Sequence, residues 1–67
     1  MKDAAEFFKL LSVDKRIEII ELLKEDNMNV NSIAKSLGIS QSAISQHLRV
    51  LKAAGLVKDE RRGYWIH

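Results

Sequence analysis

The sequence of 67 residues contains no cysteine and no proline. Without cysteine, no disulfide can cross-link the chain and no thiolate is available to bind a metal ion. The sequence also lacks a long run of apolar residues, and charged residues stand within its first six positions. These features exclude a membrane-spanning segment and a secretory signal at this N-terminus. We therefore expect a cytoplasmic protein without a membrane partner.

The residues that enzymes need are also scarce. The chain has only two histidines, no glycine-rich phosphate loop and no pair of carboxylates arranged for acid–base catalysis. We therefore predict that it is not an enzyme and uses no cofactor. Its length suits one domain, residues 1–67, whose small core favours association with a partner.

The net charge of +2 is unevenly distributed. Residues 1–37 carry six lysines or arginines against seven acids, a net of −1, whereas residues 38–67 carry five against two, a net of +3. This asymmetry fits a nucleic-acid-binding surface in the C-terminal half of the chain.

Apolar residues recur with helical spacing in four segments of the chain. These segments are residues 3–11, 15–25, 31–37 and 41–54. Asp14 and Ser40 stand at N-cap positions of the second and fourth segments, and Gly38 and Gly55 follow the third and fourth. Only residues 38–40 separate the third segment from the fourth, and so short a link with a glycine is typical of a helix-turn-helix.

After Gly55 the pattern changes to that of short strands. Residues 56–58 and 64–67 have strand propensity, and Arg61-Arg62-Gly63 between them indicates a turn in which Gly63 can take a positive φ. We therefore predict a mainly α-helical fold with a small β-hairpin. This is a winged helix-turn-helix, with four helices followed by a two-stranded antiparallel wing.

The fourth helical segment has a polar side without acidic residues. Projected at about 100° per residue, its apolar and polar side chains separate. The apolar side comprises Ala43, Ile44, Leu48, Val50, Leu51 and Ala54, and the polar side comprises Gln41, Ser42, Ser45, Gln46, Arg49 and Lys52. Acids would repel phosphates, whereas Ser, Gln and Arg can contact base edges and phosphates. All of these polar residues except Lys52 are therefore predicted to bind DNA. The alternative is that this is the solvent-exposed side of an ordinary helix that is rich in serine by chance.

His47 projects onto the border of the apolar side of the same segment. It either reads bases or binds a metal ion, or it is a partly buried histidine with local hydrogen bonds. The position of His47 on that border favours the interpretation as a partly buried histidine.

Lys58, Arg61 and Arg62 place three positive charges in and beside the predicted hairpin turn. Arginines at a hairpin tip can reach a neighbouring groove or its phosphates. Alternatively, Asp59 and Glu60 pair with the arginines and leave a solvated turn. The polar helix nearby favours DNA binding by the three basic residues.

The second helical segment carries an acidic stripe of Glu18, Glu21 and Glu25, which should face away from DNA. Most of the remaining surface of this helix is apolar, and we expect it in the core. These apolar residues are Ile17, Ile19, Ile20, Leu22 and Leu23.

The first helical segment is predicted to form a homodimer interface through Phe7, Phe8, Leu10 and Leu11. Phe8 and Leu10 lie about 160° apart on the helix, so one flat contact cannot bury both. A second chain would cover the side that is left exposed. The alternative is that loops of the same chain half-cover it.

The order of these segments and their amino-acid sequences resemble those of the ArsR-type family of bacterial and archaeal winged-helix repressors. The resemblance covers nearly the whole chain. The matching segments are residues 8–12, 16–23, 33–34, 37–57 and 62–63. It implies a homodimeric repressor that releases its operator when an effector binds, with Gln41, Ser42, Ser45 and Gln46 in the major groove.

The sequence departs from the family pattern in two places. Metal-sensing members carry Cys-Val-Cys where this chain has Asn29-Val30-Asn31, so that metal site is absent here. Most members also continue past the wing into a further helix, whereas this sequence stops at His67. Either the natural protein is short, or this sequence is part of a longer one.

These features together predict a sequence-specific transcriptional regulator, a repressor, that binds double-stranded DNA as a homodimer. Residues 41–54 would read the major groove, and residues 58–63 would contact the backbone or the minor groove. The alternative is a winged-helix module that binds protein or RNA, because a fold does not fix a function.

Overall fold

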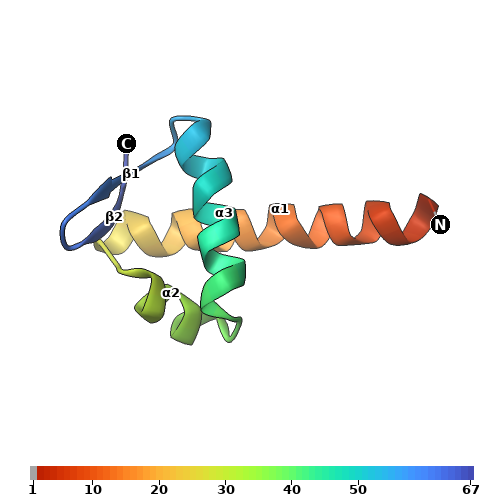
Figure 1. The fold of residues 1–67 in the computed structure, drawn as a ribbon, viewed down its shortest axis with the longest axis horizontal. Helices are drawn as coiled ribbons and strands as arrows, with labels where there is room; N and C mark the ends of the chain where they lie inside the picture. The colour runs from red at the N-terminus through yellow and green to blue at the C-terminus, as the bar shows by residue number, and fades with distance from the viewer. Residues whose placement is uncertain (1) are drawn as a thin grey trace.

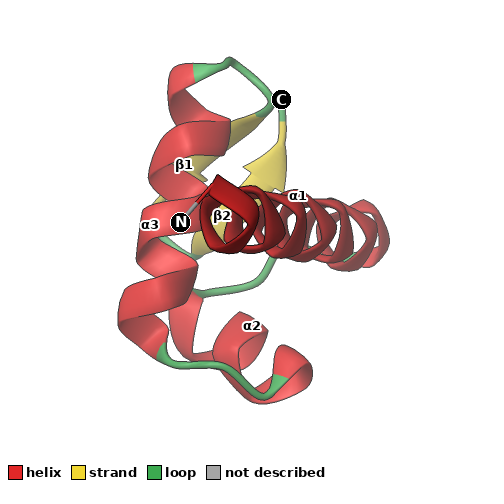
Figure 2. Ribbon diagram, turned by 90° about the vertical axis from the view of Figure 1, so that its right-hand side faces the viewer, coloured by secondary structure: helices red, strands yellow, loops and turns green. Residues whose placement is uncertain are grey.

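A computed structural model describes the backbone of residues 2–67 and the side chains of residues 12–67. Three helices are followed by two strands (Figures 1 and 2). They are α1 (Lys2–Glu25), α2 (Val30–Leu37), α3 (Gln41–Ala53), β1 (Val57–Glu60) and β2 (Gly63–Ile66). The predicted winged helix-turn-helix is confirmed, with α2 and α3 as the helix pair and the antiparallel strands as the wing. None of the described helices has the length and apolar character that crossing a bilayer requires.

The predicted division of the N-terminal region into two helices is wrong, because α1 runs without interruption through residues 12–14. No glycine or proline stands in this stretch, and Ser, Val and Asp each cost a helix only about 0.5 kcal/mol relative to alanine. Asp14 is therefore an interior residue of α1 and not an N-cap. The next residue, Lys15, places Nζ 3.1 Å from Glu18 Oε2 on the surface of the same helix.

The N-terminal half of α1 extends beyond the other elements of the fold (Figure 1). This half carries the residues predicted to form a dimer interface. Their side chains lie outside the described part of the structure; they are Phe7, Phe8, Leu10 and Leu11.

Local caps define the start of α2 and the turn between α2 and α3. Asn29 precedes α2, and its Oδ1 accepts a hydrogen bond from the backbone N–H of Ser32 at 2.8 Å. Gly38 ends α2 with φ +68° and donates its N–H to the Ala34 carbonyl at 2.9 Å. Ser40 then caps α3 by accepting from the N–H of Ala43 at 3.2 Å. The predicted roles of Gly38 and Ser40 are confirmed.

The core lies where α1, α2, α3 and β1 meet. Its buried side chains are Ile19, Leu23, Ile33, Ala34, Ile44, Leu48, Leu51 and Val57. Val50 and Ala54, predicted on the apolar side of α3, are exposed instead. Val50 lies about 100° around the helix from Leu51, and the core covers a narrower arc than the projection assumed.

The wing is joined to the loop between α1 and α2. Met28 and Tyr64 exchange two backbone hydrogen bonds, from Met28 N–H to the Tyr64 carbonyl at 3.3 Å and from Tyr64 N–H to the Met28 carbonyl at 2.8 Å. Gly63 has φ +144°, and a Cβ at this residue would lie 2.7 Å from the Met28 carbonyl carbon and oxygen. Glycine is therefore required both for the turn and for this close approach.

Candidate nucleic-acid interface

Helix α3 presents its polar side to solvent. Figure 2 shows α3 at one edge of the molecule, with α1, α2 and the wing lying to the other side of it. Ser42, Gln46 and Arg49 are exposed, whereas Ser45 is half-buried. The helix contains no acidic residue, and its first turn follows a capping serine. This surface can therefore donate hydrogen bonds and carries positive but no negative charge of its own.

The beginning of α3 is fixed by contacts that the sequence did not reveal. Gln41 Nε2 donates to Asn31 Oδ1 of α2 at 3.1 Å, which links the two helices of the motif. The Ser42 hydroxyl lies 3.3 Å from that of Ser40. Gln41 and Ser42 are thus held in place at the N-terminal end of α3. The sequence pattern did not predict a contact for Asn31, because only the fold brings it beside Gln41.

The wing tip carries two arginines whose charges are not neutralised nearby. Arg61 and Arg62 form the turn between the paired residues Glu60 and Gly63, and both are exposed. The alternative that the neighbouring acids pair with these arginines is wrong. Asp59 Oδ2 lies 3.5 Å from Lys52 Nζ, and Glu60 Oε1 lies 3.2 Å from Lys58 Nζ.

These ion pairs distinguish Lys58 from the two arginines among the basic residues predicted to bind DNA in the wing. Lys58 shares its charge with Glu60. Arg61 and Arg62 have no ion pair within residues 12–67, the part whose side chains are described. The Asn27 side chain donates from Nδ2 to the Arg62 carbonyl at 3.4 Å, so the backbone of the turn is tied to the loop after α1.

His47 is half-buried on the side of α3 that faces α1, as the interpretation as a partly buried histidine predicts. Its pKa is lowered from the ordinary value of 6.5, first by burial and then by the positive charges of Arg16 and Lys15. The imidazole is therefore neutral at pH 7. The structure gives it no hydrogen bond to a described side chain, so the local hydrogen bonds expected for it are not found.

The acidic stripe of α1 points away from α3. Glu18, Glu21 and Glu25 are exposed, and their centre lies about 145° around the helix from the buried Ile19 and Leu23. Ile17, predicted in the core, is 51% exposed. The negative charge of α1 and the polar side of α3 thus lie on different sides of the molecule.

Comparison with known proteins adds evidence from sequence and fold. The model of the family described as "Bacterial regulatory protein, arsR family" matches residues 14–59. The transcriptional repressor SdpR of Bacillus subtilis (strain 168) is 40% identical over 60 residues, which cover 90% of this chain and 67% of that protein. The arsenical resistance operon repressor of Escherichia coli (strain K12) is 36% identical over 63 residues, covering 92% of this chain and 54% of the repressor. The chain thus spans between about half and two thirds of the length of these relatives.

A solved structure has the same fold. It is the solution NMR structure of the homodimeric winged helix-turn-helix DNA-binding domain of a possible ArsR-family transcriptional regulator from Mycobacterium bovis. The TM-score is 0.74 at 29% identity, and the match covers 97% of this chain and 69% of that one.

Proposed function

The chain belongs to the arsR family of bacterial regulatory proteins, and from this premise we propose that it binds specific sites on double-stranded DNA and represses transcription. The observation that carries the proposal is the exposed, acid-free polar side of α3 next to the two unneutralised arginines of the wing. As a regulator of transcription it would act in the cytoplasm, without catalysis or a cofactor. Its partner would be DNA.

In this proposal α3 lies in the major groove. Ser45, Gln46 and Arg49 lie in the middle turns of α3, Ser45 at the border of the exposed side, so they would contact base edges there. Gln41 and Ser42, held by Asn31 and Ser40, would fix the position of the helix N-terminus against the DNA.

The wing would bind differently. Arg61 and Arg62 sit on a short turn that can reach phosphates or the adjacent minor groove, where contacts depend little on sequence. Lys58 belongs to the same basic group, but its ion pair with Glu60 reduces the charge that it offers to phosphate. The wing thus supplies affinity, and α3 supplies specificity.

We also propose that the DNA-binding form is a homodimer. The N-terminal half of α1, with Phe7, Phe8, Leu10 and Leu11, projects from the domain (Figure 1) and would meet the same segment of a second chain. The homodimeric state of the Mycobacterium bovis relative supports this arrangement. A two-fold axis would match a palindromic site whose half-sites are about one helical turn of DNA apart, or a multiple of it.

The test is selection of bound duplexes from a random DNA pool, followed by affinity measurements by fluorescence anisotropy. We expect a palindromic consensus. Replacing Ser45 and Gln46 by alanine should cost about 1–3 kcal/mol of binding free energy on that consensus and much less on random duplex. Ser36→Ala, an exposed serine of α2, is the matched control and should not change the discrimination.

Two outcomes would contradict the proposal. If the Ser45 and Gln46 variants discriminate between sites as well as the original protein, α3 does not read the sequence. If single-stranded RNA binds more tightly than any selected duplex, the chain is an RNA-binding winged-helix module instead.

A further inference from the structure

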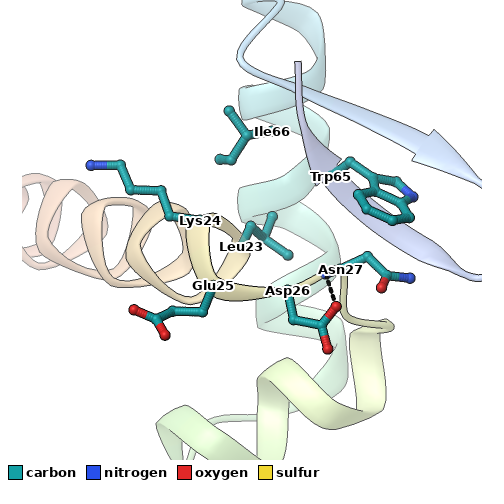
Figure 3. Close-up of a pocket in the computed structure, with 7 residues that line it drawn as sticks. All are labelled: Leu23, Lys24, Glu25, Asp26, Asn27, Trp65 and Ile66. Atoms are coloured by element: carbon teal, nitrogen blue, oxygen red, sulfur yellow. Dashed lines mark hydrogen bonds between the residues drawn. The ribbon is translucent and has the colours of Figure 1, made fainter.

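The two faces of the wing meet different parts of the molecule. Successive side chains of a strand point to opposite faces, and Figure 3 shows Trp65 and Ile66 on opposite sides of β2. The register pairs Lys58 with Trp65, so these two side chains share one face. Asp59 lies on the other face together with Val57, which is buried in the core beside α3. Asp59 is therefore on the face of the wing that is turned toward α3.

The Asp59 carboxylate forms an ion pair with the last turn of α3. Its Oδ2 lies 3.5 Å from Lys52 Nζ, and the side chains of Asp59 and Lys52 are 45% and 56% exposed. Lys52 follows Ser45 by about two helical turns and lies only about 20° from it around α3. Lys52 therefore extends the row of residues proposed to contact DNA, and Asp59 reaches this row from the wing.

A duplex bound as proposed would bring phosphates to this junction between α3 and the wing. With α3 in the major groove, and with Arg61 and Arg62 at the neighbouring backbone or minor groove, the sugar–phosphate strand between them passes the junction. It would meet the Lys52 ammonium group, which attracts phosphate, and the Asp59 carboxylate, which repels it. Exposed ion pairs contribute little to the stability of a fold, so Lys52 can exchange the carboxylate for a phosphate while the domain stays folded.

Starting from the proposed DNA binding, on which this step rests, we infer that Lys52 is a further DNA-binding residue and that Asp59 competes with phosphate for its ammonium group. Binding a phosphate through Lys52 breaks the ion pair and leaves the Asp59 carboxylate beside the DNA backbone, and both changes oppose binding. Because the phosphates are the same in every sequence, Asp59 weakens binding to all duplexes alike, whereas the base contacts of α3 choose among them.

The experiment measures the affinity of the intact chain for a random duplex and for the selected consensus, by fluorescence anisotropy between about 50 and 200 mM salt. Asp59→Asn should raise the affinity for both duplexes at least about threefold at the lower salt concentration. It should also steepen the slope of log affinity against log salt by about 1, as one more phosphate contact would. Glu21→Gln is the matched control, because it also removes a carboxylate from an ion pair with a lysine, Lys24, but on the side of α1 turned away from α3. It should leave affinity and slope nearly unchanged.

A double-mutant cycle tests the competition for Lys52. Lys52→Ala should lower the affinity at least about twofold more in the Asp59→Asn background than in the original protein, where the ion pair must first be broken. Unchanged affinity of Asp59→Asn, or equal losses from Lys52→Ala in the two backgrounds, would overturn the inference. Loss of discrimination between consensus and random duplex would instead contradict site-specific repression, and the variants compared on random duplex would still decide the role of Asp59.

Discussion

The helix-turn-helix and the wing are held in place by different kinds of contact. The two ends of α2 and the start of α3 are fixed by hydrogen bonds that span three or four residues and involve Asn29, Gly38 and Ser40. The wing is fixed by contacts with the loop after α1, more than thirty residues away in the chain, such as the bond from Asn27 to Arg62. The helix ends of the motif proposed to read DNA are thus capped by residues of the motif and its immediate flank, whereas the wing is tied to a distant segment of the chain.

Substitutions should therefore affect the stability of the two parts differently. A change in a cap weakens one helix end and leaves the remaining contacts intact. A change at the contact between the wing and Met28 affects two segments at once, because it displaces both β2 and the loop that enters α2. Among substitutions outside the buried core, we therefore expect the most damaging one in the wing, and not at the caps of the helix-turn-helix.

The largest effect is predicted for Gly63→Ala. The added methyl group would lie 2.7 Å from the Met28 carbonyl, and φ of +144° is strained for any residue with a Cβ. We expect a loss of about 2–4 kcal/mol in the free energy of unfolding, measured with urea. Gly38→Ala is the matched control, because φ is also positive but nothing lies within 4 Å of the new Cβ; it should cost about 1–2 kcal/mol. Equal losses would show that the contact with Met28 does not fix the wing.

The next effect concerns the charge of the wing tip. Replacing Arg61 and Arg62 by alanine should weaken binding to every duplex and reduce the slope of log affinity against log salt by about 2. Between about 50 and 200 mM salt, the affinity of the original protein should therefore fall roughly tenfold more than the affinity of the variant. Lys58→Ala should change the slope less, because Lys58 is already paired with Glu60. A slope that falls as much for Lys58→Ala as for one arginine would remove this distinction.

The caps should give a smaller and purely local effect. Ser40→Ala deletes the hydroxyl that accepts from the Ala43 N–H and should lower the free energy of unfolding by about 1 kcal/mol. Ser36→Ala, inside α2 and exposed, should be neutral or slightly stabilising, because alanine is the better helix former. Thermal unfolding monitored by circular dichroism distinguishes the two variants. A Ser40→Ala protein as stable as Ser36→Ala would contradict the role of the cap.

The smallest effect is a dependence of stability on pH. Because the pKa of His47 is lower in the folded chain than its ordinary value of 6.5, the unfolded chain binds the proton more readily. Stability should therefore fall as the pH drops below 6.5. His47→Gln should reduce this loss between about pH 7.5 and 5.5 in urea titrations. His67→Gln changes the only other histidine and serves as the control; a loss that disappears only in that variant would exclude His47 as its source.

The sequence was sufficient where structure depends on neighbours in the chain. Helical spacing, a serine cap and a glycine after α2 located the helix-turn-helix to within a residue or two, and the polar side of α3 followed from the same periodicity. The DNA contacts predicted for that side and for the wing, and the predicted dimer, are the proposals that the binding experiments test.

The sequence was insufficient where tertiary contacts decide. Asp14 resembles a cap, but nothing near it interrupts α1, so the helix continues. Asn29 was considered only as a residue that replaces a metal ligand, whereas the structure shows it capping α2. The ion pair between Asp59 and Lys52 depends on where the fold places β1 beside α3, which a linear pattern does not encode. The pair between Lys58 and Glu60 joins two residues on the same face of β1.

The register of the wing also bears on aggregation. Strand β2 is bordered by β1 on one side and by Met28 on the other, so among residues 2–67 the open edge of this small sheet belongs to β1. Lys58, Asp59 and Glu60 follow one another along that edge. A strand from another molecule could pair there only by displacing water from three charged groups, which is a common protection against edge-to-edge association. Copies of the protein at high concentration would thus be kept from joining through their wings.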